Sequence, residues 1–286
     1  MQIGFLGKGV FGSAIGSLVE ANGHLPEYVD VGDVFEQSPE VLFIAVPVQV
    51  LRDALVTHQT SLKDVRLIVN CSKGIEVTSG LLPHQIVADV LGRSQYVAVS
   101  GPSFAHEILK KMPTSVSIAG NDQNSVVQIA SLLRRPYFIL EELGTVLELE
   151  LAGAMKNVYA LASGYVAGSG GGENTHAHVQ VVALREYTKL VHALEGNSDV
   201  VRPGVVGDLI LTAGSKESRN YQFGFALAGG KDIPRCTAEG VATSEAIQLL
   251  AKQNNVTLPL SQAIEGLVRQ DATAHDRFYR ALGFAL

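Results

Sequence analysis

Short apolar segments alternate with helix-like segments through the first half of this chain, and this alternation limits the fold more than any other feature. The helix-like spacing of apolar residues covers residues 11–22, 80–91 and 123–133. Strand-like segments are bounded by Gly, Pro, Asn or Ser and cover residues 2–6, 41–46, 66–71, 96–100, 115–119 and 137–140. Strands that alternate with helices predict a doubly wound, mainly parallel sheet with helices on both faces.

The pattern changes near residue 144. Long helical runs with little strand signal follow, at residues 148–166, 176–194, 217–227, 243–253 and 261–269. We therefore predict an α/β domain over residues 1–145 and an all-α domain over residues 146–286. A cleft between the two is the expected place for a ligand.

A glycine-rich turn follows the first strand directly and opens the first helix. It reads Gly7-Lys8-Gly9-Val10-Phe11-Gly12, the spacing of a dinucleotide-binding fingerprint. The first glycine permits a tight turn, the second lets the backbone approach a pyrophosphate, and the third allows close packing of helix on strand. The turn predicts a Rossmann-type domain whose helix N-terminus faces phosphate. The alternative is a glycine turn required only for packing.

The segment after this turn is short for a dinucleotide-binding domain. Residues 13–42 leave little room for a helix, a second strand, a second helix and their turns. Asp30 lies near the distance at which an acidic residue binds the adenosine ribose, but a solvated loop carboxylate is an equal alternative.

Polar residues follow two neighbouring strands of the predicted sheet. Lys73 comes directly after the strand at 66–71, and the turn Ser100-Gly101-Pro102-Ser103 follows the strand at 96–100. Because ligands of open α/β sheets bind beyond the carboxyl ends of the strands, we expect both groups to converge on one crevice.

The helical half carries a lysine inside a run of small and apolar residues, Ala154-Met155-Lys156-Asn157-Val158. Taken alone, this pattern fits a functional lysine and a lysine whose stem lies along apolar surface while its amine reaches water equally well. Further on, Asp208 adds a carboxylate and Arg219 a guanidinium that could bind phosphate through paired hydrogen bonds.

These motifs together resemble those of the NAD(P)-dependent glycerol-3-phosphate dehydrogenases, over most of the chain and in the same order. The matching segments are residues 7–12, Ala45-Val46-Pro47, Ser72-Lys73-Gly74-Ile75-Glu76, residues 100–105, residues 154–158, Gly207-Asp208-Leu209, Ser218-Arg219-Asn220 and Glu239-Gly240-Val241. The resemblance implies interconversion of sn-glycerol 3-phosphate and dihydroxyacetone phosphate, with NAD or NADP as cofactor. It also implies a role in supplying glycerol 3-phosphate for phospholipid synthesis.

The resemblance also implies roles for individual residues. Lys156 would accept the proton of the C2 hydroxyl, with Lys73 and Asp208 beside it as further catalytic groups. The implied substrate-binding residues are Lys73, Gly101, Ser103, Asn157, Asp208, Thr212, Ser218, Arg219 and Asn220, of which Arg219 and Asn220 would hold the phosphate. The implied cofactor-binding residues are Gly7, Gly9, Val10, Phe11, Gly12, Lys73, Ala105, Arg219 and Glu239. No metal ion is expected.

The chemistry of the reaction fits a lysine in this role. Oxidation of a secondary alcohol needs a base for the hydroxyl proton and a hydride acceptor that faces the carbon. Burial of Lys156 and a second cation such as Lys73 would both favour its uncharged form, and in the reverse direction the ammonium would polarise the ketone.

The chain departs from the family pattern in two places. The segment between His24 and Ala45 is shorter, so the second strand, its ribose-selecting residue and the following helix should be largely missing and the adenosine site weakened. Val181-Val182-Ala183 stands where the family has Thr-Arg-Gly. His176 and His178 are spaced wrongly for a shared metal ion on a helix and are read as packing or surface residues.

Composition limits the partners. The net charge of −6 gives no general attraction for nucleic acid or an anionic membrane. Cys71 and Cys236 are the only cysteines, and the N-terminus has no signal-peptide pattern, so we expect a cytoplasmic protein. The family suggests a homodimer.

Two alternatives remain open from the sequence. One is a catalytically impaired binding or regulatory homologue with a reduced dinucleotide site, which the short segment favours. The other is a related two-domain dehydrogenase that acts on another small acid, against which Asp208 and the Ser-Arg-Asn segment count.

Overall fold

A computed structural model describes residues 1–30, 32–92, 95–229 and 238–285. Cys236 lies outside these residues, and Cys71 is a buried free thiol. The chain forms two compact units, and one boundary between them falls within a long helix. The first unit comprises Met1–Lys73, Leu82–Glu150 and Arg202–Gly204, and the second comprises Gly74–Leu81, Leu151–Val201 and Val205–Leu286.

The first unit contains a seven-stranded sheet. Its strands are β1 (Ile3–Leu6), β2 (Glu27–Val29), β3 (Val41–Ile44), β4 (Leu67–Asn70), β5 (Tyr96–Ser100), β6 (Thr114–Gly120) and β7 (Phe138–Glu142). The order in the sheet is β2-β1-β3-β4-β5-β6-β7, and all neighbours are parallel except β5 and β6. The doubly wound, mainly parallel sheet is confirmed, and so are the six predicted strands.

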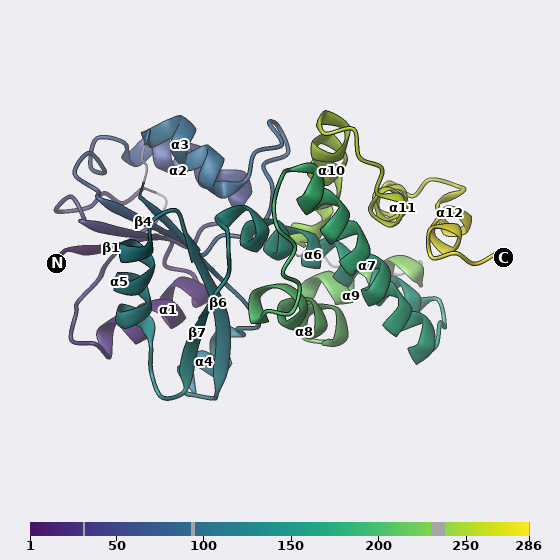
Figure 1. Ribbon diagram of the computed structural model, residues 1–286, viewed down its shortest axis with the longest axis horizontal. Coiled ribbons are helices and arrows are strands. Elements are labelled where there is room, and N and C mark those ends of the chain that lie inside the picture. Colours follow the sequence, from purple (N-terminus) through teal and green to yellow (C-terminus); the bar gives the residue numbers. More distant parts are fainter. Residues whose placement is uncertain (31, 93–94, 230–237, 286) are drawn as a thin grey trace. The chain divides into compact units, whose positions relative to one another are not determined.

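Helices cover both faces of this sheet (Figure 1). One group packs on the face formed by Phe5, Phe43 and Val69 and consists of α1 (Val10–Glu20), α4 (Ala105–Leu109) and α5 (Gln123–Leu133). The helices α2 (Val48–His58) and α3 (Pro83–Leu91) pack against each other on the other face. Because side chains alternate along a strand, both faces must be apolar, which explains the continuous apolar runs seen in the sequence.

The prediction for the shortened segment is half wrong. The second strand exists, because β2 pairs in parallel with β1, with Glu27 opposite Gly4 and Val29 opposite Leu6. The helix that should follow it is absent from the described residues 32–40, as predicted. Instead Phe35 is buried against β1, where a Cβ added to Gly4 would lie 2.6 Å from its ring. One aromatic side chain thus covers the sheet in place of a helix.

The second unit is built from helices joined by turns and loops, with no strand among its described residues, so the all-α prediction is confirmed. It contains most of α6 (Val146–Gly168). Its other helices are α7 (Glu173–Ala193), α8 (Asp208–Gly214), α9 (Arg219–Ala228), α10 (Glu239–Gln253), α11 (Pro259–Val268) and α12 (Ala274–Ala281), and a π-helical turn at Pro203–Gly207 precedes α8. The short helices α8 and α12 escaped the sequence analysis. Within the described part of the chain, no helix has both the length and the apolar character needed to cross a membrane.

Two glycines allow α6 and α9 to cross with their backbones in contact. A Cβ added to Gly164 would lie 2.0 Å from the carbonyl oxygen of Tyr221, and one added to Gly224 would lie 2.0 Å from that of Leu161. No real Cβ tolerates such an approach, so the crossing requires glycine at both positions. This crossing fixes where the first turn of α9 lies along α6.

A buried carboxylate holds the start of α11. Glu186 of α7 accepts hydrogen bonds from the backbone N–H of Leu260 at 2.6 Å and from the N–H and hydroxyl of Ser261 at 3.0 and 2.6 Å. These bonds satisfy donors that a helix N-terminus leaves unpaired. Burial raises the pKa of Glu186 above its ordinary value.

Stability should therefore fall as pH rises through this raised pKa. The folded state holds the Glu186 proton more tightly than the unfolded state, so the stabilisation is complete below the ordinary glutamate pKa and is lost above the folded value. Urea unfolding of wild type and Glu186→Gln across pH 4 to 8 measures this effect: the fall in stability with rising pH should be smaller in Glu186→Gln than in wild type. It should persist in Glu173→Gln, which changes an exposed carboxylate in the first turn of the same helix. Equal slopes in all three proteins would contradict the assignment.

Candidate active site

Lys156 forms a buried polar cluster with two groups from α8. Its ammonium donates to Asp208 Oδ1 at 2.6 Å and to Thr212 Oγ1 at 2.9 Å. The Thr212 hydroxyl lies 3.3 Å from the same carboxylate oxygen. Lys156 is 9% exposed and Asp208 is 1% exposed, so water screens this pair little. Lys156 therefore does not extend to water, and the alternative drawn from its apolar surroundings is wrong.

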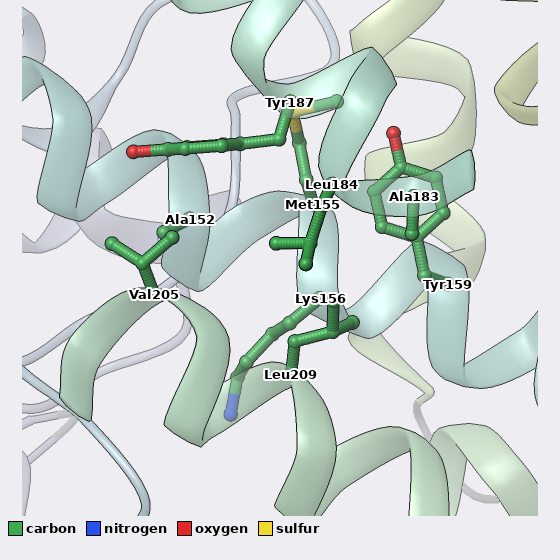
Figure 2. A pocket seen from close by; sticks show the side chains of 9 residues that line it. All are labelled: Ala152, Met155, Lys156, Tyr159, Ala183, Leu184, Tyr187, Val205 and Leu209. Atoms are coloured by element: carbon green, nitrogen blue, oxygen red, sulfur yellow. The ribbon is translucent and has the colours of Figure 1, made fainter. Parts of the chain in front are cut away.

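Apolar side chains hold the stem of Lys156. Figure 2 shows its amine pointing away from the rings of Tyr159 and Tyr187 and passing Leu209. The hollow lined by these side chains has a volume of about 10 Å³, room for about one water molecule and not for a substrate. Ala183 is fully buried in the lining of this hollow. The hollow therefore serves to pack the lysine stem.

A second cluster lies one residue further along α6. Asn157 accepts from the Asn220 side-chain amide at 3.0 Å and donates to Glu239 Oε2 at 3.2 Å. Asn220 in turn accepts from the backbone N–H of Gly240 at 2.9 Å. A Cβ on Gly240 would lie 2.5 Å from the carbonyl oxygen of Asn157, so α10 also begins in contact with α6. These bonds tie the starts of α9 and α10 to the helix that carries Lys156.

Arg219 occupies the first turn of α9 and is exposed. Ser218 caps this helix, because its hydroxyl accepts from the backbone N–H of Tyr221 at 3.3 Å. A guanidinium beside a helix N-terminus combines a planar donor group with the positive end of the helix dipole. This part of the site is suited to an anion.

The strand ends of the first unit converge as predicted. Lys73 Nζ donates to the carbonyl oxygen of Gly101 at 3.4 Å, and the Ser103 hydroxyl donates to the same oxygen at 2.8 Å. These three residues follow β4 and β5, which are neighbours in the sheet. Ala105, another predicted site residue, begins α4 just beyond them.

A buried hydrogen-bond network supports the Lys73 segment, and the sequence analysis did not identify it. Asn70, the last residue of β4, accepts from the backbone N–H of Ser72 at 2.9 Å and donates to Glu150 Oε1 at 3.0 Å. Glu150 also accepts from the Tyr96 hydroxyl at 2.5 Å and contacts His84 Nδ1 at 2.7 Å. Burial and the Glu150 carboxylate raise the pKa of Tyr96 well above its usual value, so Tyr96 remains a donor.

The glycine turn has the geometry that a pyrophosphate needs. Gly7 has φ +107°, and a Cβ there would lie 2.9 Å from the Ala45 carbonyl oxygen. A Cβ at Gly12 would lie 2.4 Å from the carbonyl oxygen of Gly7, which accounts for the close packing of α1 on β1. Gly9, the N-cap of α1, faces open space. Val10 and Phe11 continue the turn as the first residues of α1, and Val10 is 70% exposed.

A cavity of about 250 Å³ lies beyond the carboxyl ends of β1, β2 and β3. Its lining includes Leu6, Asp30, Val46, Asp53 and His58. His58 is 3% exposed, and its Nδ1 atom has no hydrogen-bond partner among the described residues. A cavity and an unsatisfied nitrogen beside the glycine turn fit a dinucleotide. The weakened adenosine site stays a prediction: the crossover helix is missing from the described residues 32–40, and a cavity remains where that site is expected.

Comparisons with known proteins agree with this geometry. The family model "NAD-dependent glycerol-3-phosphate dehydrogenase N-terminus" matches residues 24–126, and the corresponding C-terminus model matches residues 146–278. The glycerol-3-phosphate dehydrogenase [NAD(P)+] of Brucella ovis is 33% identical over 231 residues, which are 80% of this chain and 71% of the relative. That of Gluconobacter oxydans is 32% identical over 259 residues, which are 88% of this chain and 80% of the relative.

A solved structure shows the same fold. The crystal structure of glycerol-3-phosphate dehydrogenase from Coxiella burnetii matches with a TM-score of 0.90 and 23% identity, over 99% of both chains. The chain therefore belongs to the NAD-dependent glycerol-3-phosphate dehydrogenase family, and the predicted NAD(P)-dependent oxidoreductase activity is confirmed.

Proposed function

We propose that the protein interconverts sn-glycerol 3-phosphate and dihydroxyacetone phosphate with Lys156 as the proton-transferring residue. The observation that carries this assignment is the buried cluster of Lys156, Asp208 and Thr212, with Nζ 2.6 Å from the carboxylate and 2.9 Å from the hydroxyl. Asp208 stabilises the charged ammonium, and both partners fix its position on α6. A charged donor held in one place is what protonation of a ketone oxygen requires.

Proton transfer then follows from the position of this amine. When the carbonyl carbon of dihydroxyacetone phosphate is reduced, Lys156 Nζ donates a proton to the oxygen that becomes the C2 hydroxyl. In the oxidation, the uncharged amine accepts that proton. NAD(P), when bound, supplies or accepts the hydride. Asp208 and Thr212 keep the amine in place in both directions.

The phosphate of the substrate is assigned to the start of α9. Arg219 is exposed there, and Ser218 orders the first turn. Because Asn157 and Asn220 bond to each other and to Glu239 and Gly240, we assign them to fixing this turn relative to Lys156. Lys73, Gly101 and Ser103 are proposed as further substrate-binding groups on the unit that carries the glycine turn.

The remaining assignments are also proposals. Gly7, Gly9, Val10, Phe11 and Gly12 hold the cofactor pyrophosphate, and Lys73, Ala105, Arg219 and Glu239 complete its site. Residues 1–145 form the dinucleotide-binding domain and residues 146–286 the substrate domain. The protein acts in the cytoplasm as a homodimer, independently of nucleic acid and membranes, and supplies glycerol 3-phosphate for phospholipid synthesis.

The direct test is the fall in NADH or NADPH absorbance when dihydroxyacetone phosphate is added to the purified protein. Turnover is the expected result. Absence of turnover with either cofactor, at any pH between 6 and 9, would overturn the proposed reaction.

Replacement of Arg219 tests the phosphate assignment. Arg219→Ala should raise the KM for dihydroxyacetone phosphate by about 10- to 100-fold, since charge-assisted hydrogen bonds to an anion contribute about 1.5–3 kcal/mol. Inorganic phosphate should inhibit this variant more weakly than wild type. The control is Arg280→Ala, which removes an exposed arginine of α12. An unchanged KM in Arg219→Ala would place the phosphate elsewhere.

A further inference from the structure

We propose that Glu150 is a positioning residue, because it fixes the backbone segment from which Lys73 projects. The inference rests on the proposed role of Lys73 in the cofactor site and adds a residue that makes none of the proposed contacts with substrate or cofactor. The observation that carries it is a continuous set of hydrogen bonds from Glu150 through Asn70 to Ser72, the residue before Lys73. All of these residues belong to the first unit.

The Glu150 carboxylate is buried and has two donors at each oxygen. The side chain is 4% exposed. Its Oε1 accepts from Asn70 Nδ2 at 3.0 Å and from the Tyr96 hydroxyl at 2.5 Å. Its Oε2 accepts from the backbone N–H of His84 at 3.1 Å and lies 2.7 Å from His84 Nδ1. Because hydrogen bonds must replace the water that a buried carboxylate has lost, these donors hold both oxygens in place.

Glu150 sets the orientation of the Asn70 side-chain amide. Because a carboxylate can only accept, Asn70 must turn its NH₂ group toward Glu150. In this orientation the Asn70 oxygen accepts from the backbone N–H of Ser72 at 2.9 Å, and the NH₂ group also donates to the Ser72 carbonyl oxygen at 3.0 Å. The reversed amide would present NH₂ to an N–H group and oxygen to a carbonyl. Glu150 thus selects the one orientation of Asn70 that binds Ser72 by both backbone groups.

Fixing Ser72 also fixes the start of Lys73. The Ser72 hydroxyl donates to the Val46 carbonyl oxygen at 2.5 Å, so the backbone and the side chain of Ser72 are both held. Lys73 comes next in the chain, and its ammonium donates to the Gly101 carbonyl oxygen at 3.4 Å. A lysine side chain has many rotamers, so a fixed backbone limits the positions that its charge can occupy. The network therefore acts on ligands through the Lys73 amine.

Glu150→Gln should break this link and leave Lys73 itself unchanged. The NH₂ group of the new glutamine must face either His84 or Asn70. The backbone N–H of His84 can only donate, so the NH₂ group should turn toward Asn70 and reverse its amide. Ser72 then loses both of its bonds to Asn70.

Calorimetric titration of the purified protein with NADH, arranged as a double-mutant cycle, tests the inference. Lys73→Met should raise the Kd for NADH by about 10- to 100-fold, as expected for the loss of one charge-assisted hydrogen bond. Glu150→Gln should raise it by about 3- to 30-fold, within the range of couplings between residues of one network. In the Lys73→Met background, Glu150→Gln should change the Kd by less than about twofold, because its effect passes through the missing amine.

Tyr96→Phe is a second, milder variant for the case that Glu150→Gln does not fold. It removes one donor to Glu150 without a change of charge, and should raise the Kd less, and only when Lys73 is present. The control is Glu142→Gln, which makes the same exchange at the exposed last residue of β7 and should leave the Kd unchanged. Circular dichroism establishes that each variant is folded.

The cycle separates a positioning role from a structural one. Equal effects of Glu150→Gln and Tyr96→Phe with and without Lys73 would overturn the inference, since the network would then serve stability alone. Wild-type affinity in both variants, wild-type affinity in Lys73→Met, or absence of NADH binding by wild type would overturn it as well. Coupled effects on NADH binding in a protein that does not turn over dihydroxyacetone phosphate would leave it standing and refute the proposed reaction. Turnover with additive effects would do the reverse.

Discussion

Lys156→Met should reduce kcat for dihydroxyacetone phosphate by about 10²- to 10⁴-fold, the range attributed to one positioned acid–base group. Methionine keeps much of the length of the side chain and fits the apolar surroundings of the lysine stem, but it has no proton to donate. Substrate affinity should change less, because the proposed phosphate contacts lie on α9. Initial rates of NADH or NADPH oxidation at several substrate concentrations separate the two effects.

A buried ion pair complicates the reading of this variant. Removal of Lys156 leaves Asp208, which is 1% exposed, without its cation. An uncompensated buried charge costs about 3–5 kcal/mol of stability. Lost activity could then reflect partial unfolding. The double variant Lys156→Met with Asp208→Asn removes both charges and should recover most of the stability while activity stays low.

These two proteins therefore separate chemistry from folding. Lys252→Met is the matched control, since it exchanges an exposed lysine in the last turn of α10 for the same residue. If the double variant is stable and turns over within tenfold of wild type, Lys156 is not the proton-transferring group. If only the single variant loses activity, Lys156 and Asp208 have a structural role.

The sequence predicts well those features that depend on local pattern. The glycine turn at Gly7 and the lysine after β4 were identified because each directly follows a strand, and the topology of a parallel sheet then fixes the edge at which they lie. Lys156 was recognised from its apolar neighbours in the chain. Its partner Asp208 was assigned by resemblance alone, because a separation of 52 residues carries no local signal.

The features that were missed include a very short strand, one helix with a recognisable pattern and a set of tertiary contacts. Strand β2 has three residues, too few to display an alternating pattern. Asp53 and His58 lie on α2, whose buried residues Val48, Leu51 and Leu55 follow helical spacing after Pro47 and could have revealed that helix. Glu150 was read as part of a helical run, and nothing in the sequence signals its bonds to Asn70 and Tyr96.

Gly224→Ala should destabilise the protein by about 3 kcal/mol, the upper end of the usual cost of overpacking, since the added Cβ meets backbone and not a side chain that can move. The Cβ would lie 2.0 Å from the Leu161 carbonyl oxygen, so α9 must move away from α6. Gly214→Ala is the matched control, because Gly214 is the last residue of α8 and a Cβ added there would point into open space. The control should change stability by at most about 0.5 kcal/mol. Urea unfolding of the three proteins gives the comparison.

The same substitution should impair the reaction where the protein is still folded. Movement of α9 lengthens the 3.0 Å bond between Asn220 and Asn157, and so displaces Arg219 relative to Lys156. A displacement of about 1 Å can reduce a rate by about 10²-fold, so kcat/KM measured at a temperature well below the unfolding transition should fall by that order. Wild-type kcat/KM in a folded, destabilised Gly224→Ala would mean that the helix crossing serves stability alone. Wild-type stability would mean that α6 and α9 do not touch here.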